Sequence, residues 1–333
     1  SQRESLLSSE VQEGKVQPIP WKMLSTAVRV QLAKGLQKDF ARILQAGLTK
    51  RNCSLQTMDF KTLNVTRPRD FVVQVELNRP EKRNAMNTDF WREMRECFSQ
   101  LAEDTDCRAV VLSGAGKIFT SGLDLTDNKD VKFEELMSPD KDFARKAFQI
   151  RQAVIHLQES FNVIERCPKP VIAAVHSACV GGGIDMICAC DIRYCSSDAW
   201  FSIKEVDIGL AADLGTLQRF PKVIGNDSLA RELAYTARKM YADEAKDVGF
   251  VSRVFPDREK LIEGAVELAS VIASKSPVAV QGTKVSMVYS RDHTVGEGLD
   301  QVMTWNQGML QSEDVMKAVF GSMKKETPVF SKL

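Results

Sequence analysis

The chain has 333 residues, of which 44% are hydrophobic and 27% are charged, a composition typical of a globular protein with enough chain to bury a core. Its 45 basic and 44 acidic side chains leave a net charge of +1, which excludes a globally basic nucleic-acid-binding protein and an acidic disordered chain. No apolar run reaches the length that crosses a bilayer, so a transmembrane protein is excluded as well.

The eight cysteines and three histidines give little support to disulfide or metal chemistry. The cysteines show no CxxC spacing, and several lie within apolar runs, where a free cysteine behaves as a small hydrophobic residue. With only His156, His176 and His293, a histidine-rich metal site is not expected. Acid–base work would therefore fall to carboxylates.

A basic amphipathic segment precedes the first strand signal. Apolar residues recur every four positions from Leu24 to Leu44, which is the spacing of one helix face. Residues 23–51 also contain six basic side chains and one acid, Asp39. This pattern is typical of a mitochondrial presequence and favours it over a surface helix docked on the main body. Residues 1–65 are therefore predicted to form an N-terminal leader.

The α/β pattern is expected to begin near Asp70. Residues 71–77 and 109–112 read as buried strands, and the second strand ends at a glycine turn. Between them, Asn87 is expected to cap a helix. The apolar face of that helix consists of Phe90, Met94, Cys97 and Leu101.

A long helix and two more strands follow. Ser138 and Pro139 indicate the N-cap and first residue of the helix, which is expected to stop at Cys167, before a proline. Its predicted apolar stripe comprises Phe143, Ala147, Ile150, Val154, Leu157, Phe161 and Ile164. Residues 171–175 and 192–195 read as strands. Strands that alternate with helices predict an α/β fold.

Helical signals dominate beyond Pro221. Helices are expected at residues 229–238, 242–248, 261–274, 277–289 and 295–311, with one late strand at 251–255. The chain is therefore divided into an α/β core at 66–258 and a C-terminal helical region at 259–333. Helical regions of this kind often carry subunit contacts.

Two glycine-containing loops follow buried strands, FTSGLDL at 119–125 and CVGGGID at 179–185. Glycine lets backbone amides approach a ligand closely, and two amides that converge on one point would stabilise an oxyanion. Alternatively, the three glycines permit tight helix–sheet packing, and the first loop is only a surface turn. A phosphate-binding loop is disfavoured, because neither GKS/T nor the GxGxxG spacing is present.

Three carboxylates are candidates for proton transfer. Asp185 stands just after the glycine turn, where a core position would be apolar, while Glu205 and Asp213 bracket an apolar loop. An acid in an apolar cleft has the raised pKa that a proton shuttle near neutral pH needs. Alternatively, Glu205 is a solvated neighbour of a lysine and Asp213 is the N-cap of the next helix. Spacing alone does not exclude Asp207, which is equally acidic.

The run from Asn78 to Met86, the FTSGLDL loop and the CVGGGID turn resemble the crotonase (enoyl-CoA hydratase/isomerase) superfamily, from about Leu63 to the C-terminus. The resemblance implies a spiral of ββα units with a C-terminal helical region that builds trimers, usually paired into hexamers. Residues 161–176 and 204–226 are most similar to the branch that converts 3,5-dienoyl-CoA to 2,4-dienoyl-CoA.

The resemblance also implies roles for individual residues. The backbone amides of Leu123 and Gly182 would form an oxyanion hole for the thioester carbonyl. Glu205 and Asp213 would transfer protons, with Asp185 as the third acid of the pocket. Typical hydratases have glutamate at positions 185 and 205 and no acid at 213, so this set of acids is the discriminating feature. The implied substrate-binding residues are Ser121, Gly122, Leu123, Asp124, Leu125 and Gly182.

The implied activity is an isomerase of unsaturated fatty acid β-oxidation that acts on an acyl-CoA thioester and forms a homo-oligomer. Asp213 would take the proton at C2 and Glu205 would deliver one at C6, with no metal, nicotinamide or flavin. The alternatives are an enoyl-CoA hydratase or Δ3-Δ2-enoyl-CoA isomerase on the same scaffold, and a non-catalytic binding module. The neutral charge disfavours RNA as the ligand of such a module.

Two further features concern location and local geometry. Residues 331–333, SKL, match a peroxisomal targeting tripeptide, so together with the presequence-like segment they predict residence in peroxisomes and mitochondria. Ser177 stands where the family usually has glycine, which is acceptable only if its backbone avoids the glycine-only region. His176 beside it is expected to be a core or loop histidine.

Overall fold

The structure is a computed structural model that describes residues 59–127 and 142–333. The described residues all belong to one compact unit of the chain. Most of the predicted leader therefore lies outside the described residues. No helix within the described residues is both long enough and apolar enough to cross a membrane.

The main sheet has six strands in the order β1-β2-β3-β4-β6-β9. Only β1 and β2 pair antiparallel, and the other neighbours are parallel. The bounds are β1 Leu63–Arg69, β2 Val72–Leu77, β3 Ala109–Gly114, β4 Val171–Val175, β6 Ile192–Ser196 and β9 Arg253–Phe255. The predicted strands are confirmed, but the α/β pattern begins earlier than expected, because β1 precedes Asp70 and was not predicted.

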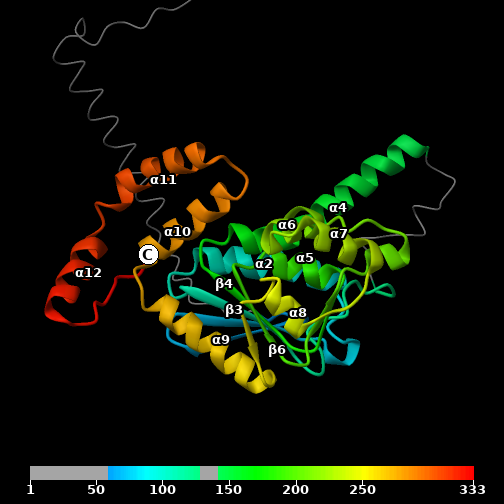
Figure 1. The fold of residues 1–333 in the computed structure, drawn as a ribbon, viewed down its shortest axis with the longest axis horizontal. Helices are drawn as coiled ribbons and strands as arrows, with labels where there is room; N and C mark the ends of the chain where they lie inside the picture. Colours follow the sequence, from blue (N-terminus) through cyan, green and yellow to red (C-terminus); the bar gives the residue numbers. More distant parts are fainter. Residues whose placement is uncertain (1–58, 128–141) are drawn as a thin grey trace, which may run out of the picture. The chain divides into compact units, whose positions relative to one another are not determined.

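Helices cover both faces of this sheet (Figure 1). Helix α9 (Arg258–Ala273) packs against alternate residues of β2, β3 and β4 through Leu261, Ala265 and Ala269. Helix α2 (Thr88–Glu103) covers the opposite face. The Asn87 side chain accepts the Phe90 amide, and the whole predicted apolar face of α2 is buried, which confirms that helix and its cap.

Helix α4 (Phe143–Arg166) is only half covered. Its N-cap is Asp142, whose side chain accepts the Arg145 amide, while Ser138 and Pro139 lie outside the described residues. The predicted apolar stripe is buried only toward its C-terminal end, because Leu157 is buried but Phe143 is 87% exposed. The N-terminal half projects beyond the core (Figure 1). Periodicity identifies the helix without showing what covers it.

A second, small sheet was not predicted. Its strands β5 (Ala178–Val180), β7 (Trp200–Ser202) and β8 (Met240–Tyr241) lie in the order β5-β7-β8. Strands of two or three residues are too short to show a period of two. This sheet leads into the short helix α5 (Gly182–Cys188) and the 3₁₀ turn η3 (Glu205–Ile208). The helices that follow are α6 (Thr216–Ile224), α7 (Asp227–Thr236) and α8 (Ala242–Asp247).

The backbone of Ser177 adopts φ +51°, in the left-handed region that favours glycine. A non-glycine residue there costs about 1–2 kcal/mol. The Ser177 carbonyl accepts the Trp200 amide at 3.0 Å, which joins the residue before β5 to β7. His176 is buried, with its Nε2 3.1 Å from the Gly116 carbonyl, and burial lowers its pKa. It is therefore a packed loop histidine, as expected.

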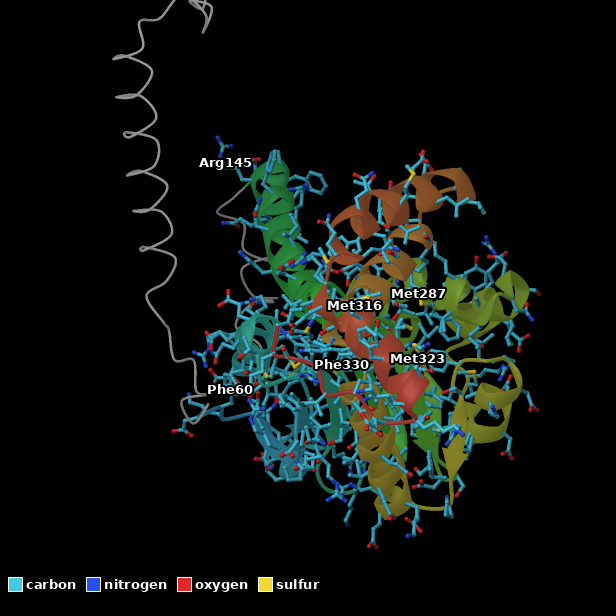
Figure 2. All side chains as sticks on the ribbon, turned by 90° about the vertical axis from the view of Figure 1, so that its left-hand side faces the viewer. Phe60, Arg145, Met287, Met316, Met323 and Phe330 are labelled. Atoms are coloured by element: carbon cyan, nitrogen blue, oxygen red, sulfur yellow. The ribbon has the colours of Figure 1, made fainter. Side chains whose placement is uncertain are left out.

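The C-terminal region consists of α10 (Pro277–Ser290), α11 (Val295–Met309) and α12 (Glu313–Lys324), the last of which was not predicted. Helix α10 is anchored to the core by buried Lys284, whose ammonium donates to Asp191 at 2.7 Å and to the Lys169 carbonyl at 3.1 Å. Several large apolar side chains of these helices are exposed, and three of them are labelled in Figure 2: Met287, Met316 and Met323.

Candidate active site

The two glycine-containing loops lie side by side. The Thr120 amide donates to the Ala178 carbonyl at 3.1 Å, and Thr120 bridges to Cys179. A Cβ on Gly122 would lie 2.8 Å from the Val180 carbonyl oxygen, and Gly122 has φ +86°. Only glycine permits both this approach and this φ without strain. The loop after β3 is therefore in direct contact with the loop after β5.

Some amides of these loops have no acceptor among the described residues, so they are available to a ligand. The neighbouring amides already have acceptors. The Asp124 amide donates to the Met86 carbonyl at 3.0 Å, and the Gly181 amide donates to the Ser202 carbonyl at 2.9 Å. The amides of Leu123 and Gly182 have no acceptor among the residues that the structure describes. Amides without partners on adjoining loops are suited to receive an oxyanion. The oxyanion-hole role of this pair stays a prediction that the loop contact supports.

The first loop is a buried element, so the surface-turn alternative is wrong. Phe119, Thr120 and Asp124 are all buried. The Asp124 carboxylate is 3.0 Å from the Arg79 guanidinium. Although burial opposes the shift, hydrogen bonds from Thr126 and Arg79 lower the pKa of Asp124. The Asp124 side chain therefore stabilises the conformation of the loop.

The other predicted substrate-binding residues are placed around the same turn. The Ser121 amide donates to the Arg83 carbonyl at 3.0 Å, and the Leu125 side chain is exposed. The Asn84 side chain, which the sequence reading left without a role, donates to three carbonyls of this loop, those of Ala115, Ile118 and Phe119. The sequence feature that could have indicated this role is the position of Asn84 within the run from Asn78 to Met86. Substrate contact by these residues stays a prediction.

The three consecutive glycines have different surroundings. A Cβ on Gly183 would lie 2.5 Å from Thr120 Cγ2, so the close-packing alternative is correct for this position. Gly181 has φ +54°, and a Cβ there would lie 3.3 Å from Glu205 Oε1. The turn therefore brings the Glu205 carboxyl against the same backbone that carries the Gly182 amide.

Asp185 lies in the first turn of α5 and is 1% exposed. Its Oδ1 accepts the Thr216 amide at 2.6 Å, which joins α5 to the start of α6. Its Oδ2 is buried and has no hydrogen-bond partner among the described residues. Burial raises the pKa of Asp185 to about 6, against the effect of the Thr216 amide. A buried carboxyl with one unpartnered oxygen is poised to hold a proton.

Glu205 begins η3, directly after the small sheet. Its Oε2 is buried without a hydrogen-bond partner in the described part of the chain. Burial, followed by repulsion from Asp185, raises the pKa of Glu205 to about 7. The solvated-neighbour alternative is wrong, because the Lys204 ammonium pairs with exposed Asp207 instead. That ion pair also removes Asp207 from the set of candidates.

Asp213 is the exposed member of the three acids. Its carbonyl accepts the Gln158 side chain at 2.6 Å. Helix α6 begins at Thr216 with Gly215 as its N-cap, so the N-cap alternative for Asp213 is wrong. Partial burial raises the pKa of Asp213, and its charge raises the pKa of both other acids. The structure therefore brings the three predicted carboxyls within electrostatic range of one another.

We expect Glu205 to make stability fall as pH rises. A carboxyl whose pKa is higher in the folded state stabilises that state when protonated, so its contribution is complete below the ordinary value of 4.5 and is lost as pH rises through about 7. At about 1.4 kcal/mol per pKa unit, and allowing for partial exposure, Glu205→Gln should remove about 2 kcal/mol of the fall in unfolding free energy between pH 5 and pH 8. Urea unfolding at both pH values measures this change.

The control is Asp207→Asn, which changes an exposed acid two residues away. This variant should keep the wild-type difference between the two pH values. An unchanged difference in Glu205→Gln would mean that folding does not raise the pKa of Glu205.

Residues 68–332 match the family Enoyl-CoA hydratase/isomerase, and the chain belongs to this family. A protein of Rattus norvegicus named Delta(3,5)-Delta(2,4)-dienoyl-CoA isomerase, mitochondrial, is 57% identical over 278 residues, which are 83% of this chain and 84% of that protein. A protein of Arabidopsis thaliana named Delta(3,5)-Delta(2,4)-dienoyl-CoA isomerase, peroxisomal, is 46% identical over 276 residues, 82% of this chain and 98% of its own length.

The fold likewise agrees with solved structures. An enoyl-CoA hydratase from Bacillus anthracis superposes with a TM-score of 0.72 at 30% identity, over 81% of this chain and 99% of that one. A putative enoyl-CoA hydratase from Streptomyces coelicolor gives a TM-score of 0.74 at 25% identity, over 85% and 98%. The predicted crotonase-like α/β fold with a C-terminal helical region is confirmed.

Proposed function

We propose that this chain isomerises 3,5-dienoyl-CoA thioesters to 2,4-dienoyl-CoA in the β-oxidation of unsaturated fatty acids. The names of the rat and Arabidopsis relatives support this activity. The observation that carries it is the set of three electrostatically coupled acids, Asp185, Glu205 and Asp213, whose pKa values are all raised and of which Glu205 lies against the Gly181 turn. A shift of two double bonds needs two proton-transfer groups, whereas a one-bond shift can use one.

The reaction would begin at C2 of the substrate. The amides of Leu123 and Gly182 would bind the thioester oxygen, and each such donor is worth about 3–4 kcal/mol in the transition state. The Asp213 carboxylate would take the C2 proton, and the electron pair of the broken C–H bond would delocalise onto the oxygen as a conjugated dienolate. Because Asp213 is exposed, it could return this proton to water.

The second transfer would take place at C6. Protonated Glu205 would deliver its proton there, which moves the double bonds from C3 and C5 to C2 and C4. A pKa of about 7 allows Glu205 to be reprotonated near neutral pH after each turnover. Asp185 would orient and tune the other two acids. The proposal uses the chain's own carboxyls and amides and no cofactor.

The proposed function is tested by comparing two reactions of the purified chain. We expect the conjugated 2,4-dienoyl-CoA absorbance to appear from 3,5-dienoyl-CoA much faster than water adds to a 2-enoyl-CoA. Dominant hydration would favour the hydratase alternative, and dominant turnover of a 3-enoyl-CoA would favour the Δ3-Δ2 isomerase. If the chain turned over none of these thioesters, the remaining alternative would be a non-catalytic binding module.

We also propose that the chain forms a homo-oligomer, a trimer or a hexamer, through its C-terminal helices. A groove of about 880 Å³ lies between α10, α11 and α12. Exposed apolar side chains gather on these helices, and Figure 2 shows Met316 and Met323 on α12. Apolar surface of this extent marks an interaction site.

Charging this surface should dissociate the oligomer. Met316→Glu combined with Met323→Glu would bury two charges in the proposed contact, so sedimentation should shift toward the monomer at micromolar concentration. The control is Lys317→Glu, a polar position on the same helix. An unchanged sedimentation coefficient in the double variant would place the subunit contact elsewhere.

The compartments are those of the relatives' names, mitochondrial for the rat protein and peroxisomal for the Arabidopsis protein. We propose both compartments for this chain. Deleting Leu333 from a fluorescently tagged chain should abolish peroxisomal fluorescence and leave the mitochondrial signal. An unchanged distribution would contradict the peroxisomal half.

A further inference from the structure

We infer that Arg219 is a positioning residue for the acids Asp213 and Asp185, held in place by an ion-pair cluster that joins α4, α6 and α10. This inference rests on the proposed function. Arg219 lies on the second turn of α6, outside the set of residues that the sequence singled out.

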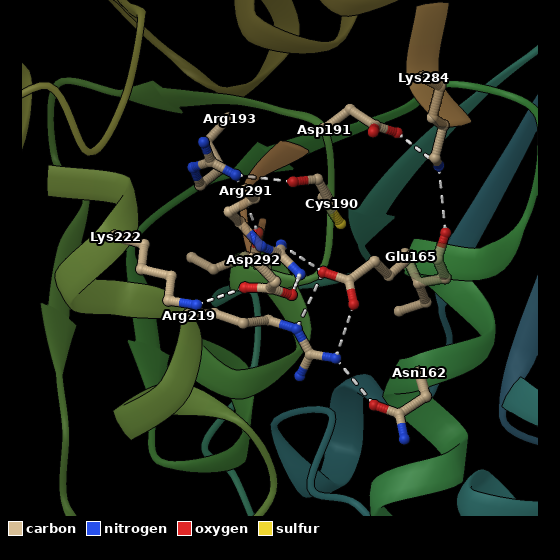
Figure 3. A network of polar contacts seen from close by, with 12 residues as sticks. Asn162, Glu165, Cys190, Asp191, Arg193, Arg219, Lys222, Lys284, Arg291 and Asp292 are labelled. Atoms are coloured by element: carbon tan, nitrogen blue, oxygen red, sulfur yellow. Dashed lines mark hydrogen bonds and ion pairs between the residues drawn. The ribbon is translucent and has the colours of Figure 1, made fainter. Parts of the chain in front are cut away.

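The Arg219 side chain is fixed on one edge by α4. It is 10% exposed, and its Nε and Nη2 each donate to a different oxygen of Glu165 at 3.1 Å (Figure 3). Nη2 also donates to Asn162 Oδ1 at 2.8 Å. Such a two-pronged contact fixes the plane of a guanidinium, which an ammonium could not achieve.

The Glu165 carboxylate also binds a residue of the C-terminal region. Glu165 accepts a second guanidinium, that of Arg291 at the end of α10 (Figure 3). Although burial opposes the shift, Arg291 and Arg219 lower the pKa of Glu165, which keeps it charged. The neighbouring Asp292 pairs with Lys222 of α6. The cluster therefore ties α6 to two other helices.

The opposite edge of Arg219 lies against the loop that carries the acids. A Cβ on Gly215 would lie 2.0 Å from Nη1, so the guanidinium occupies the space beside the Gly215 backbone, which has φ +130°. Gly215 is two residues after Asp213 and directly before Thr216, whose amide holds Asp185. Any displacement of Arg219 is thus transmitted to both acids through this backbone.

A second contact from α4 acts on the same loop. Gln158 donates to the Asp213 carbonyl at 2.6 Å, one helical turn before Asn162. The charge of Arg219 also favours the ionised form of Asp185. Stability alone does not account for such a cluster, because a buried ion pair commonly contributes little to folding compared with well-packed apolar side chains. Its contacts instead converge on the loop between Asp213 and Thr216.

The test compares Arg219→Met with Arg238→Met in the full chain. Arg238 has two carboxylate partners of its own, Glu232 and Glu244, and none of the three acids. Arg219→Met should lower kcat for 3,5-dienoyl-CoA by about 10²-fold with little change in KM, since a misplacement of about 1 Å costs that much. Arg238→Met should keep the wild-type kcat. Equal kcat values in the two variants would overturn the inference.

Two further variants separate positioning from folding. Arg219→Met combined with Glu165→Met removes both members of the two-pronged pair and leaves Arg291 with Asp292, so the variant should fold as the wild type does by circular dichroism, yet keep the low kcat. A return to the wild-type kcat would show that Arg219 only neutralises Glu165, and would overturn the inference. Arg219→Lys should have a higher kcat than Arg219→Met, because lysine keeps the positive charge but cannot make the two-pronged contact with Glu165. A wild-type chain that does not isomerise 3,5-dienoyl-CoA would contradict the proposed function itself.

Discussion

Replacing Glu205 with glutamine should lower kcat for 3,5-dienoyl-CoA isomerisation by about 10²–10⁴-fold, the usual contribution of a general acid or base. Glutamine has nearly the shape of glutamate and can keep its place beside Gly181, but its carboxamide is too weak an acid to deliver a proton at C6. KM should therefore change little, since the amides and the loop that receive the thioester are untouched. Steady-state kinetics that follow the 2,4-dienoyl chromophore measure both constants.

Asp207→Asn is the matched control for this experiment. It removes an acid from the same 3₁₀ turn, but one that is exposed and paired with Lys204. It should retain nearly the full wild-type kcat. If Glu205→Gln also retained most of its activity, Glu205 would have no part in proton transfer and the two-acid scheme would fail.

The second large effect is expected from the Gly182 amide. Gly182→Pro removes this N–H at the first residue of α5, a position whose backbone proline accepts readily. Loss of one oxyanion donor should lower kcat by about 10²–10³-fold. The measurement is the same chromophore assay, with circular dichroism to show that the fold is kept.

Gly182→Ala tests the steric effect of a Cβ at this position while the N–H is kept. Its Cβ would lie 3.2 Å from Met86 Sδ, the flexible part of a side chain that can yield a few tenths of an ångström. The alanine variant keeps the N–H and should keep most of the activity. Equal losses in the alanine and proline variants would mean that shape, rather than the amide, determines the effect.

The parts of the fold that could be predicted from the sequence are those with strong local signals. Strands β3 and β4 are short, continuous apolar runs, and the helix after Asn87 has a cap, and the chain alone reveals both signals. Strands β5, β7 and β8 have two or three residues, too few for a period. The exposure of Phe143 on α4 depends on what packs against that helix, which no local pattern contains.

In the candidate site, too, local signals could be identified from the sequence and long-range contacts could not. The two loops and the acids Asp185, Glu205 and Asp213 could be identified from motifs and from the resemblance. What fixes the acids could not be identified, because the Thr216 amide lies 31 residues from the carboxylate it holds, and Arg219 lies 54 residues from Glu165. Such contacts exist only after the helices have packed.

The assignment of one acid to each carbon is tested most directly by incubating Glu205→Gln and Asp213→Asn with 3,5-dienoyl-CoA in D₂O. Deuterium at C2 of the recovered substrate is then measured by mass spectrometry and NMR. With Glu205→Gln, Asp213 should still exchange the C2 proton while product forms about 10²–10⁴-fold more slowly, and Asp213→Asn should lose most of both. Exchange at C2 that persists in Asp213→Asn and is lost in Glu205→Gln would contradict the assignment.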